Sequence, residues 1–208
     1  MAKERGPLLF LLWAIQLTVV LLLIQAPWIE HAMTVERGWI VEEFGLEKTG
    51  RMEDQAMDRF RHWCIDSGWV KESYVRLLPD RKASQSGMEG LAPGFFAWMK
   101  KRIDAAWWIV YEAIFRVVLL QTWQLYLGAL GVAAMVDGLV SRAIKRREHG
   151  YSSSDRFALA RRGILVLFVA LLVYLFLPVP ISPLAIPIWA GLCSLALGLL
   201  AAHTQQRT

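Results

Sequence analysis

The stretch from Gly163 to Ala202 constrains this chain more than any other part, because it carries no charged side chain. A single helix crosses a bilayer with about 20 residues, so the stretch is too long for one crossing. Proline ends or kinks a helix, and the stretch contains Pro178, Pro180, Pro183 and Pro187. The pattern predicts two membrane-spanning helices, 162–178 and 184–202, joined by a tight turn.

Two further uncharged runs predict additional spans at 8–27 and 117–136. Together with a hydrophobic content of 56%, they indicate an all-α, polytopic membrane protein with four transmembrane helices. A cleaved signal peptide is the alternative for the first run, since Lys3 and Arg5 precede it. The run is longer than a usual signal core, and Gln25-Ala26-Pro27 is a poor cleavage site, which favours a retained helix.

The distribution of Lys and Arg predicts the orientation of these helices, because cytoplasmic loops carry an excess of basic residues. The loop 137–162 has seven basic residues against three acidic ones, and both terminal tails are basic. The segment 30–104 is near balance, with twelve basic and thirteen acidic residues. We therefore expect the loop and both termini in the cytoplasm, and 30–104 on the outer side, the periplasm of a Gram-negative bacterium.

The outer segment shows helical patterns and no strand pattern. Apolar residues at helical spacing predict an amphipathic helix over about 51–66, followed by a second short helix that Pro79 ends. A long helical run then covers 94–145 and continues through the second span, with a kink near Glu112 left open. Glu112 and Arg116 are four residues apart, so they can pair on one helix face.

The predicted organisation comprises a cytoplasmic N-tail with the first span (1–29), a small helical periplasmic segment (30–104), an interfacial helix running into the second span (105–136), a basic cytoplasmic loop (137–161), a hairpin of the third and fourth spans (162–202) and a cytoplasmic C-tail (203–208).

No catalytic or metal-binding motif is present. The chain lacks GxSxG, HExxH, Walker A, GxGxxG and CxxC, and its four histidines are scattered. Cys64 and Cys193 lie in different predicted elements, so an internal disulfide is not expected. A disulfide from Cys64 to a partner is the alternative to a buried thiol. We expect no catalytic residue, no metal and no cofactor, and we do not predict an enzyme.

Small residues in the spans predict close helix packing, because small side chains let backbones approach each other in lipid. One stripe follows the fourth span and a shorter one follows the second. The candidates are Ala190, Ser194, Gly198 and Ala202 in the former, and Ala129 and Ala133 in the latter. Packing within the chain and packing against a partner or a second copy are both open.

The basic loop is the most distinctive local sequence, and we read it as a helical hairpin that lies against anionic lipid headgroups. Docking of a protein partner and direct contact with DNA are the alternatives. The candidate docking residues are Asp137, Arg142, Lys145, Arg146, Arg147, Arg161 and Arg162.

This loop also resembles a known family. The pattern VDGLVxRxI+R…G…S…F…ARR, which covers 135–163 after a Trp-rich segment, resembles the TraJ-like four-helix inner-membrane proteins of integrative conjugative elements and conjugative plasmids. These proteins are encoded beside the type IV coupling ATPase. The resemblance extends over the whole predicted topology. Family members carry a Tyr-His pair before the final basic residues, where this chain has Phe157, Ala158 and Leu159.

The resemblance implies a partner and no reaction. TraJ-like proteins associate with the TraD/TraG-type coupling protein, a hexameric DNA-pumping ATPase, as a split form of an FtsK/SpoIIIE-like translocase. The chain would then be a non-catalytic inner-membrane subunit of a conjugative type IV secretion machine. Two other readings stay open: an entry-exclusion or scaffold protein of conjugation, and a small transporter, channel or membrane enzyme. The scarcity of mid-membrane charges disfavours the last.

Overall fold

The structure is a computed structural model that describes residues 11–16, 18–19, 26–78, 93–147 and 154–203. These residues form helices joined by turns, with no strand among them, which confirms the all-α class. The chain divides into two compact units. The apolar unit consists of the described residues within 1–13, 120–174 and 184–208, and the charged unit consists of those within 14–119 and 175–183.

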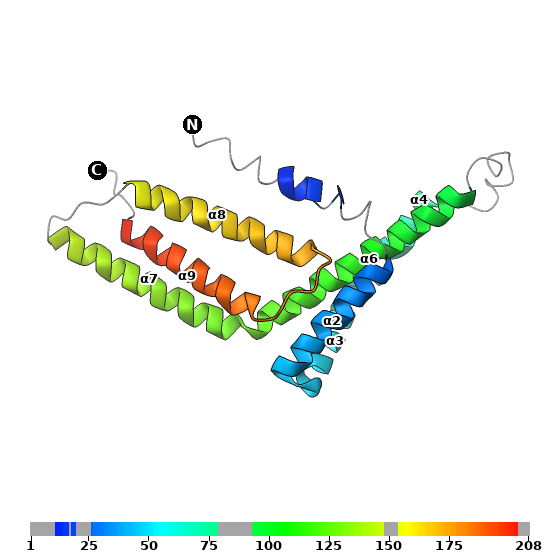
Figure 1. Ribbon diagram of the computed structural model, residues 1–208, viewed down its shortest axis with the longest axis horizontal. Coiled ribbons are helices and arrows are strands. Elements are labelled where there is room, and N and C mark those ends of the chain that lie inside the picture. Colours follow the sequence, from blue (N-terminus) through cyan, green and yellow to red (C-terminus); the bar gives the residue numbers. More distant parts are fainter. Residues whose placement is uncertain (1–10, 17, 20–25, 79–92, 148–153, 204–208) are drawn as a thin grey trace. The chain divides into compact units, whose positions relative to one another are not determined.

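The apolar unit is built from α7 (Gln124–Arg147), α8 (Ser154–Phe176) and α9 (Ala185–His203), and α9 lies between the other two (Figure 1). The helices are rich in Leu and Ala, which are strong helix formers. Each is long and apolar enough to cross a membrane. The Trp189 indole N–H on α9 donates to the Leu167 carbonyl oxygen on α8 at 3.0 Å.

Three candidate membrane-spanning helices are found among the described residues, where the sequence predicts four. Two of them, Arg156–Phe176 and Ala185–His203, agree with the predicted hairpin at 162–178 and 184–202. Half of the predicted span 8–27 lies outside the described residues, and 11–16, 18–19 and 26–27 are helical. Three such helices are compatible with a multi-pass membrane protein.

The predicted second span is displaced along the chain. Its apolar window is Gln124–Lys145 and not 117–136. The helix α6 (Pro93–Thr122) ends before this window, and Trp123 interrupts the helical hydrogen bonding, so the break lies there and not near Glu112. Val118 and Leu119 are fully buried in the charged unit. The apolar window therefore begins later than the predicted span, because an uncharged run alone does not distinguish residues buried within the chain from residues that face lipid.

The charged unit contains α2 (Ala26–Phe44), α3 (Leu46–Phe60), the π-helical turn η1 (Arg61–Ile65), α4 (Trp69–Leu77) and most of α6. The predicted helix 51–66 therefore begins earlier and changes to π-helical geometry before it ends. Gly45, between α2 and α3, has φ +83°, and Gly68, before α4, has φ +82°. Glycine adopts these left-handed angles without the steric cost that a side chain adds, which fits both residues to their turns.

The core of the charged unit joins α2 to α6. Ile29 packs against Ala105 and Ile109, with Met33 and Phe176 at the edge of the cluster. Aromatic rings join α3 to the same helix: Phe60 meets Trp107 and Tyr111 edge-on, with ring centroids 6.1 and 5.8 Å apart. These contacts fix the positions of the α6 side chains that form the sites described below.

Candidate functional site

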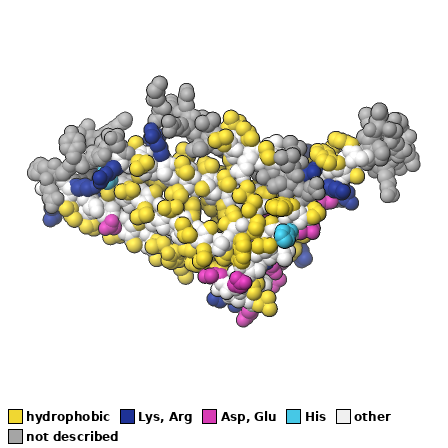
Figure 2. All heavy atoms as spheres, viewed as in Figure 1, with side chains coloured by type: hydrophobic (Ala, Val, Ile, Leu, Met, Phe, Trp, Pro, Cys, Tyr) yellow, Lys and Arg dark blue, Asp and Glu magenta, His cyan; other side chains and the backbone are white. Residues whose placement is uncertain are grey.

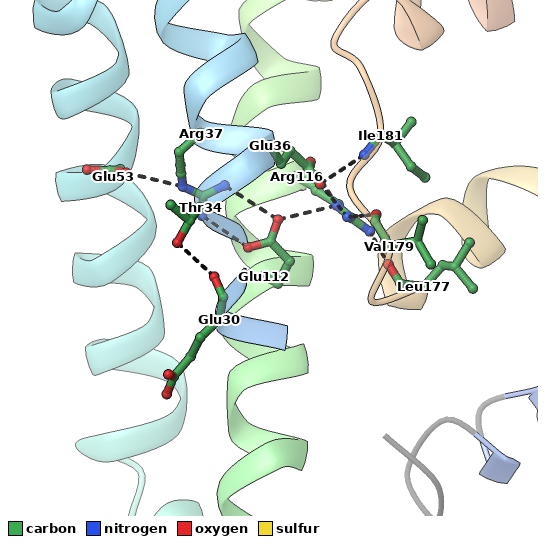
Figure 3. Close-up of polar contacts among 10 residues, drawn as sticks. All are labelled: Glu30, Thr34, Glu36, Arg37, Glu53, Glu112, Arg116, Leu177, Val179 and Ile181. Atoms are coloured by element: carbon green, nitrogen blue, oxygen red, sulfur yellow. Dashed lines mark hydrogen bonds and ion pairs between the residues drawn. The ribbon is translucent and has the colours of Figure 1, made fainter. Parts of the chain in front are cut away.

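Arg116, on α6, is the centre of a buried ion-pair network in the charged unit (Figure 3). Its side chain is almost fully buried, as is that of Glu36 on α2. The Arg116 Nε donates to Glu36 Oε1 at 3.1 Å, and Nη2 donates to Oε2 at 2.5 Å. This two-point contact is the strongest geometry for a guanidinium and a carboxylate.

The same guanidinium also holds the turn that follows α8. Arg116 Nη1 donates to the Leu177 carbonyl oxygen at 2.7 Å, and Nη2 donates to the Val179 carbonyl oxygen at 2.9 Å. Trp28 adds a third bond, from its indole N–H to the Pro178 carbonyl oxygen at 3.0 Å. Because proline has no N–H, a proline-rich turn has few donors of its own, and its part-buried carbonyls need donors from elsewhere. Arg116 and Trp28 supply them.

Arg37, one residue after Glu36, extends the network towards α3. Its Nη2 donates to Glu112 Oε2 at 3.0 Å, and its Nε lies 3.1 Å from Glu53 Oε1. The guanidinium carbon lies 3.1 Å from the centroid of the Phe115 ring, a cation–π contact. Glu112 thus contacts both arginines, and it connects α2 and α6 across the core.

The buried part of the network balances two carboxylates, Glu36 and Glu112, against two guanidinium groups. Burial raises the pKa of Glu36 above its usual value of 4.5, and the hydrogen bonds and charge of Arg116 oppose that rise. The Ile181 N–H also donates to Glu36 Oε2 at 3.3 Å. Each charge in the core therefore has partners, which is the condition under which buried charges are tolerated. The arrangement fixes a turn to two helices, and we assign it no reaction.

Sequence reasoning found one contact of this network and missed the others. The predicted pairing of Glu112 with Arg116 is confirmed, with Oε1 and Nε 3.4 Å apart. Glu36 was missed because a charged residue is normally assigned to the solvent side of a helix. The available signal is its spacing: Ile29, Glu36 and Ile40 recur at helical intervals and all three are buried.

The basic residues predicted to dock lipid or a partner gather at one end of the apolar unit, where α7 ends and α8 begins (Figures 1 and 2). Arg142 and Lys145 are half-buried, whereas Arg147, Arg161 and Arg162 are exposed. Asp137 is also exposed, about one to three turns before Arg142 and Arg147 on α7. Arg146 lies in α7, and its side chain is outside the described residues, as is the loop centre at 148–153.

The end of α9 lies against this basic end. Lys145 Nζ is 3.2 Å from His203 Nε2, and His203 Nδ1 is 3.0 Å from the Leu199 carbonyl oxygen. A carbonyl can only accept, so Nδ1 carries the proton and Nε2 accepts from the ammonium. The contact joins the C-terminal turns of α7 and α9.

The small residues of α9 face α7. Ala190, Ser194 and Ala202 are buried. A Cβ added at Gly198 would lie 3.2 Å from the Ala134 carbonyl oxygen. This stripe therefore packs within the chain, which is one of the two arrangements that the sequence left open.

On α7, the closest approach to α9 is at Gly138. A Cβ added at Gly138 would lie 2.5 Å from the Gly198 carbonyl oxygen and 2.7 Å from the Ala201 Cβ, so the helices approach closely at this glycine. Ala129 and Ala133 are exposed. Any role of these two alanines in contacting another chain stays a prediction.

The cysteines and potential metal ligands form no further site in the part of the chain that the structure describes. Both thiols are free, with Cys64 buried in η1 and Cys193 half-buried in α9. Burial raises the pKa of the Cys64 thiol, so it is a weak nucleophile. No group of three or more His, Cys, Asp or Glu side chains is arranged to hold a metal ion among these residues.

Comparison with known proteins identifies the family. A family model described as "IncC plasmid conjugative DNA transfer protein DtrJ-like" matches residues 11–206, which include all the helices described above. No match was found among curated proteins or solved structures. The family match confirms the resemblance at the level of conjugative DNA transfer. The chain therefore belongs to the DtrJ-like family of IncC plasmid conjugative DNA transfer proteins.

Proposed function

We propose that this DtrJ-like protein is a non-catalytic inner-membrane subunit of a conjugative type IV secretion machine and associates with its coupling ATPase. The family match supports a part in conjugative DNA transfer, and three apolar helices support a place in a membrane. The observation that carries the proposal is the gathering of Lys and Arg from α7 and α8 at one end of the apolar unit (Figure 2). Such a cluster attracts anionic lipid, DNA phosphates or an acidic protein surface.

The proposed topology has four spans, with both termini and the basic end in the cytoplasm. The excess of basic residues at this end supports the orientation, since positive loops stay on the cytoplasmic side. The lipid-length helices leave many apolar side chains exposed, including Leu125, Val132 and Phe168. In the assembled machine these side chains contact lipid or the transmembrane helices of the coupling protein.

Association with the coupling ATPase is tested by affinity purification of the tagged full-length protein from conjugating donor cells in mild detergent. Mass spectrometry is expected to recover the ATPase in amounts comparable to the tagged chain. Recovery of the tagged protein alone, from membranes that contain the ATPase, contradicts the association. A phenotype confined to recipient cells would then favour an entry-exclusion role.

The role of the basic end is tested by changing Lys145, Arg146 and Arg147 to glutamine together. We expect DNA transfer to fall strongly, because the docking charge is lost while the helix-forming character is kept. The matched control changes three exposed basic residues of the charged unit, Arg51, Arg61 and Lys71, to glutamine. Equal transfer by both triple variants, at equal membrane levels and unchanged topology, contradicts the proposed role.

A further inference from the structure

A groove of about 290 Å³ opens in the charged unit. It borders the ion-pair network, because its lining residue Tyr111 is hydrogen-bonded to Arg37. It lies between η1 and the helices α3, α4 and α6, and its walls are mostly aromatic. Its lining includes Phe60, Tyr74, Asp104, Trp107, Trp108 and Tyr111. Asp104 is the one acidic residue of this lining, and its side chain is half-buried, so its carboxylate can be reached from the groove.

The rings stand nearly perpendicular to one another. The planes of Phe60 and Tyr111 meet at 89°, those of Phe60 and Trp107 at 74°, and those of Trp108 and Tyr111 at 85°. In each of these edge-to-face pairs the edge of one ring meets the face of the other, which holds the rings in place beside the groove. Aromatic side chains that line one groove can bind a cation over a ring face, and aromatic cages recognise ammonium groups in this way.

The carboxylate of Asp104 adds a full negative charge to this space. The Tyr74 hydroxyl donates a hydrogen bond to Asp104 Oδ1. Burial and this bond to Asp104 raise the pKa of Tyr74 to about 12, so the hydroxyl keeps its proton at neutral pH. A carboxylate accepts about four hydrogen bonds, and Tyr74 is the partner of Asp104 among the described residues. Accepting capacity is therefore left for a ligand.

Basic and aromatic residues surround the groove. Lys100 and Lys101 lie about one helical turn before Asp104 on α6, and both are exposed. Trp63, Trp69 and Trp108 expose large parts of their side chains on the surrounding elements. Exposed tryptophan with neighbouring lysine is typical of surfaces at a membrane–water interface.

We propose that this groove binds the headgroup of a phosphatidylethanolamine-type lipid, with the ammonium between the aromatic rings and Asp104 and the phosphate on Lys100 and Lys101. A negative site and a positive site one helical turn apart match a zwitterion. A single basic side chain from a protein partner would need only the first of them. The apolar lining contributed by Met57 and Ile65 suits the glycerol end of the acyl chains.

The test is native mass spectrometry of the full-length protein in detergent, with short-chain phosphatidylethanolamine or phosphatidylglycerol added. Phosphatidylglycerol lacks the ammonium, so the wild type is expected to bind it more weakly. Asp104→Asn keeps an acceptor for Tyr74 but removes the charge, and it should weaken phosphatidylethanolamine binding about tenfold. Trp108→Leu should weaken it several-fold. Asp54→Asn, an exposed acid on α3 outside the groove, is the matched control and should change nothing.

Several outcomes would overturn the assignment. Equal binding of the two lipids by the wild type excludes an ammonium site. A preference for phosphatidylethanolamine that survives both Asp104→Asn and Trp108→Leu places the site elsewhere. If a lysine-rich peptide binds in an Asp104-dependent way and the lipid does not, the occupant is a basic protein segment. Circular dichroism checks that each variant folds. If Asp104→Asn does not fold, the binding test is made with Trp108→Leu.

Discussion

The two units differ in where their charged and apolar side chains lie. In the charged unit, Arg116 and Glu36 are among the largest fully buried side chains. In the apolar unit, only 6% of the residues in the spanning windows of α7 and α8 are buried, and 28% in that of α9. Exposed apolar helices of this length are stable in hydrocarbon and costly in water. The charged unit buries an apolar core together with paired charges, as a domain in water can, whereas the apolar unit leaves most of its apolar side chains exposed, as helices in lipid or against partner helices do.

Of the substitutions that test this difference between the units, Arg116→Leu is expected to lower the free energy of unfolding most. The change leaves Glu36 as an uncompensated buried charge and removes the donors of the Leu177 and Val179 carbonyls. Breaking a buried ion pair on one side costs about 3–5 kcal/mol of the free energy of unfolding. Chemical denaturation of the full-length protein in detergent, followed by tryptophan fluorescence, measures the loss.

The double variant Glu36→Leu with Arg116→Leu separates two causes of this loss of stability. One is the missing attraction between the two charges, and the other is the cost of a buried Glu36 carboxylate without its partner. Replacing both partners by apolar residues removes the unpaired carboxylate, so part of the lost stability should return. If the double variant is as unstable as the sum of the two single variants, the two charges do not interact as the contacts indicate.

In the apolar unit, the next largest loss of stability is expected from Gly138→Ala. The new Cβ would lie 2.5 Å from the Gly198 carbonyl oxygen, so α7 and α9 must separate. Overpacking of this kind costs about 1–3 kcal/mol. The thermal midpoint of the purified protein in detergent should fall accordingly.

Gly131→Ala is the matched control for this prediction, because it lies on the same helix and a Cβ there meets nothing within 4 Å. Alanine is the better helix former, so this variant should be neutral or slightly more stable. Equal midpoints for the two variants would mean that α7 and α9 do not pack at Gly138.

Features set by a continuous stretch of sequence could be predicted, and those set by distant contacts could not. The third and fourth spans follow from an uncharged run with prolines in its middle. The Glu112–Arg116 pair follows from a spacing of four residues. The bonds of Arg116 to Glu36 and to the Leu177 carbonyl join residues 80 and 61 positions apart, and no local pattern contains them.

The helix break at Trp123 could not be predicted for the same reason. Val117 to Leu120 are as apolar as the residues that follow, so composition alone assigns them to one span. The burial of Val118 and Leu119 in the core of the charged unit is a tertiary property. The close approach at Gly138 was missed for a related reason, since small residues occur on several faces of α7 and only the position of α9 selects one.

A pH effect confined to the charged unit is expected from Tyr74, whose pKa is raised from 10.0 to about 12. The folded protein holds this proton more tightly than the unfolded chain does. The resulting stability is therefore fully present below pH 10 and is lost as the pH rises through about 12. The free energy of unfolding should fall over this range in the wild type, and Tyr74→Phe should abolish that part of the fall. Identical alkaline profiles for the two proteins would contradict the shift.

The smallest effect is expected from an ion pair with the same chemistry as the buried network but in contact with water. Arg51 Nη2 lies 3.4 Å from Glu47 Oε1 on α3, and the two side chains are 64% and 89% exposed. Exposed pairs at this helical spacing contribute about 0.3–0.5 kcal/mol, because water solvates the charges whether or not they meet. Arg51→Gln should therefore shift the denaturation midpoint barely, and added salt should remove even that shift. A loss as large as that of Arg116→Leu would show that burial is not what gives the network its strength, and the contrast drawn between buried and exposed charge would fail.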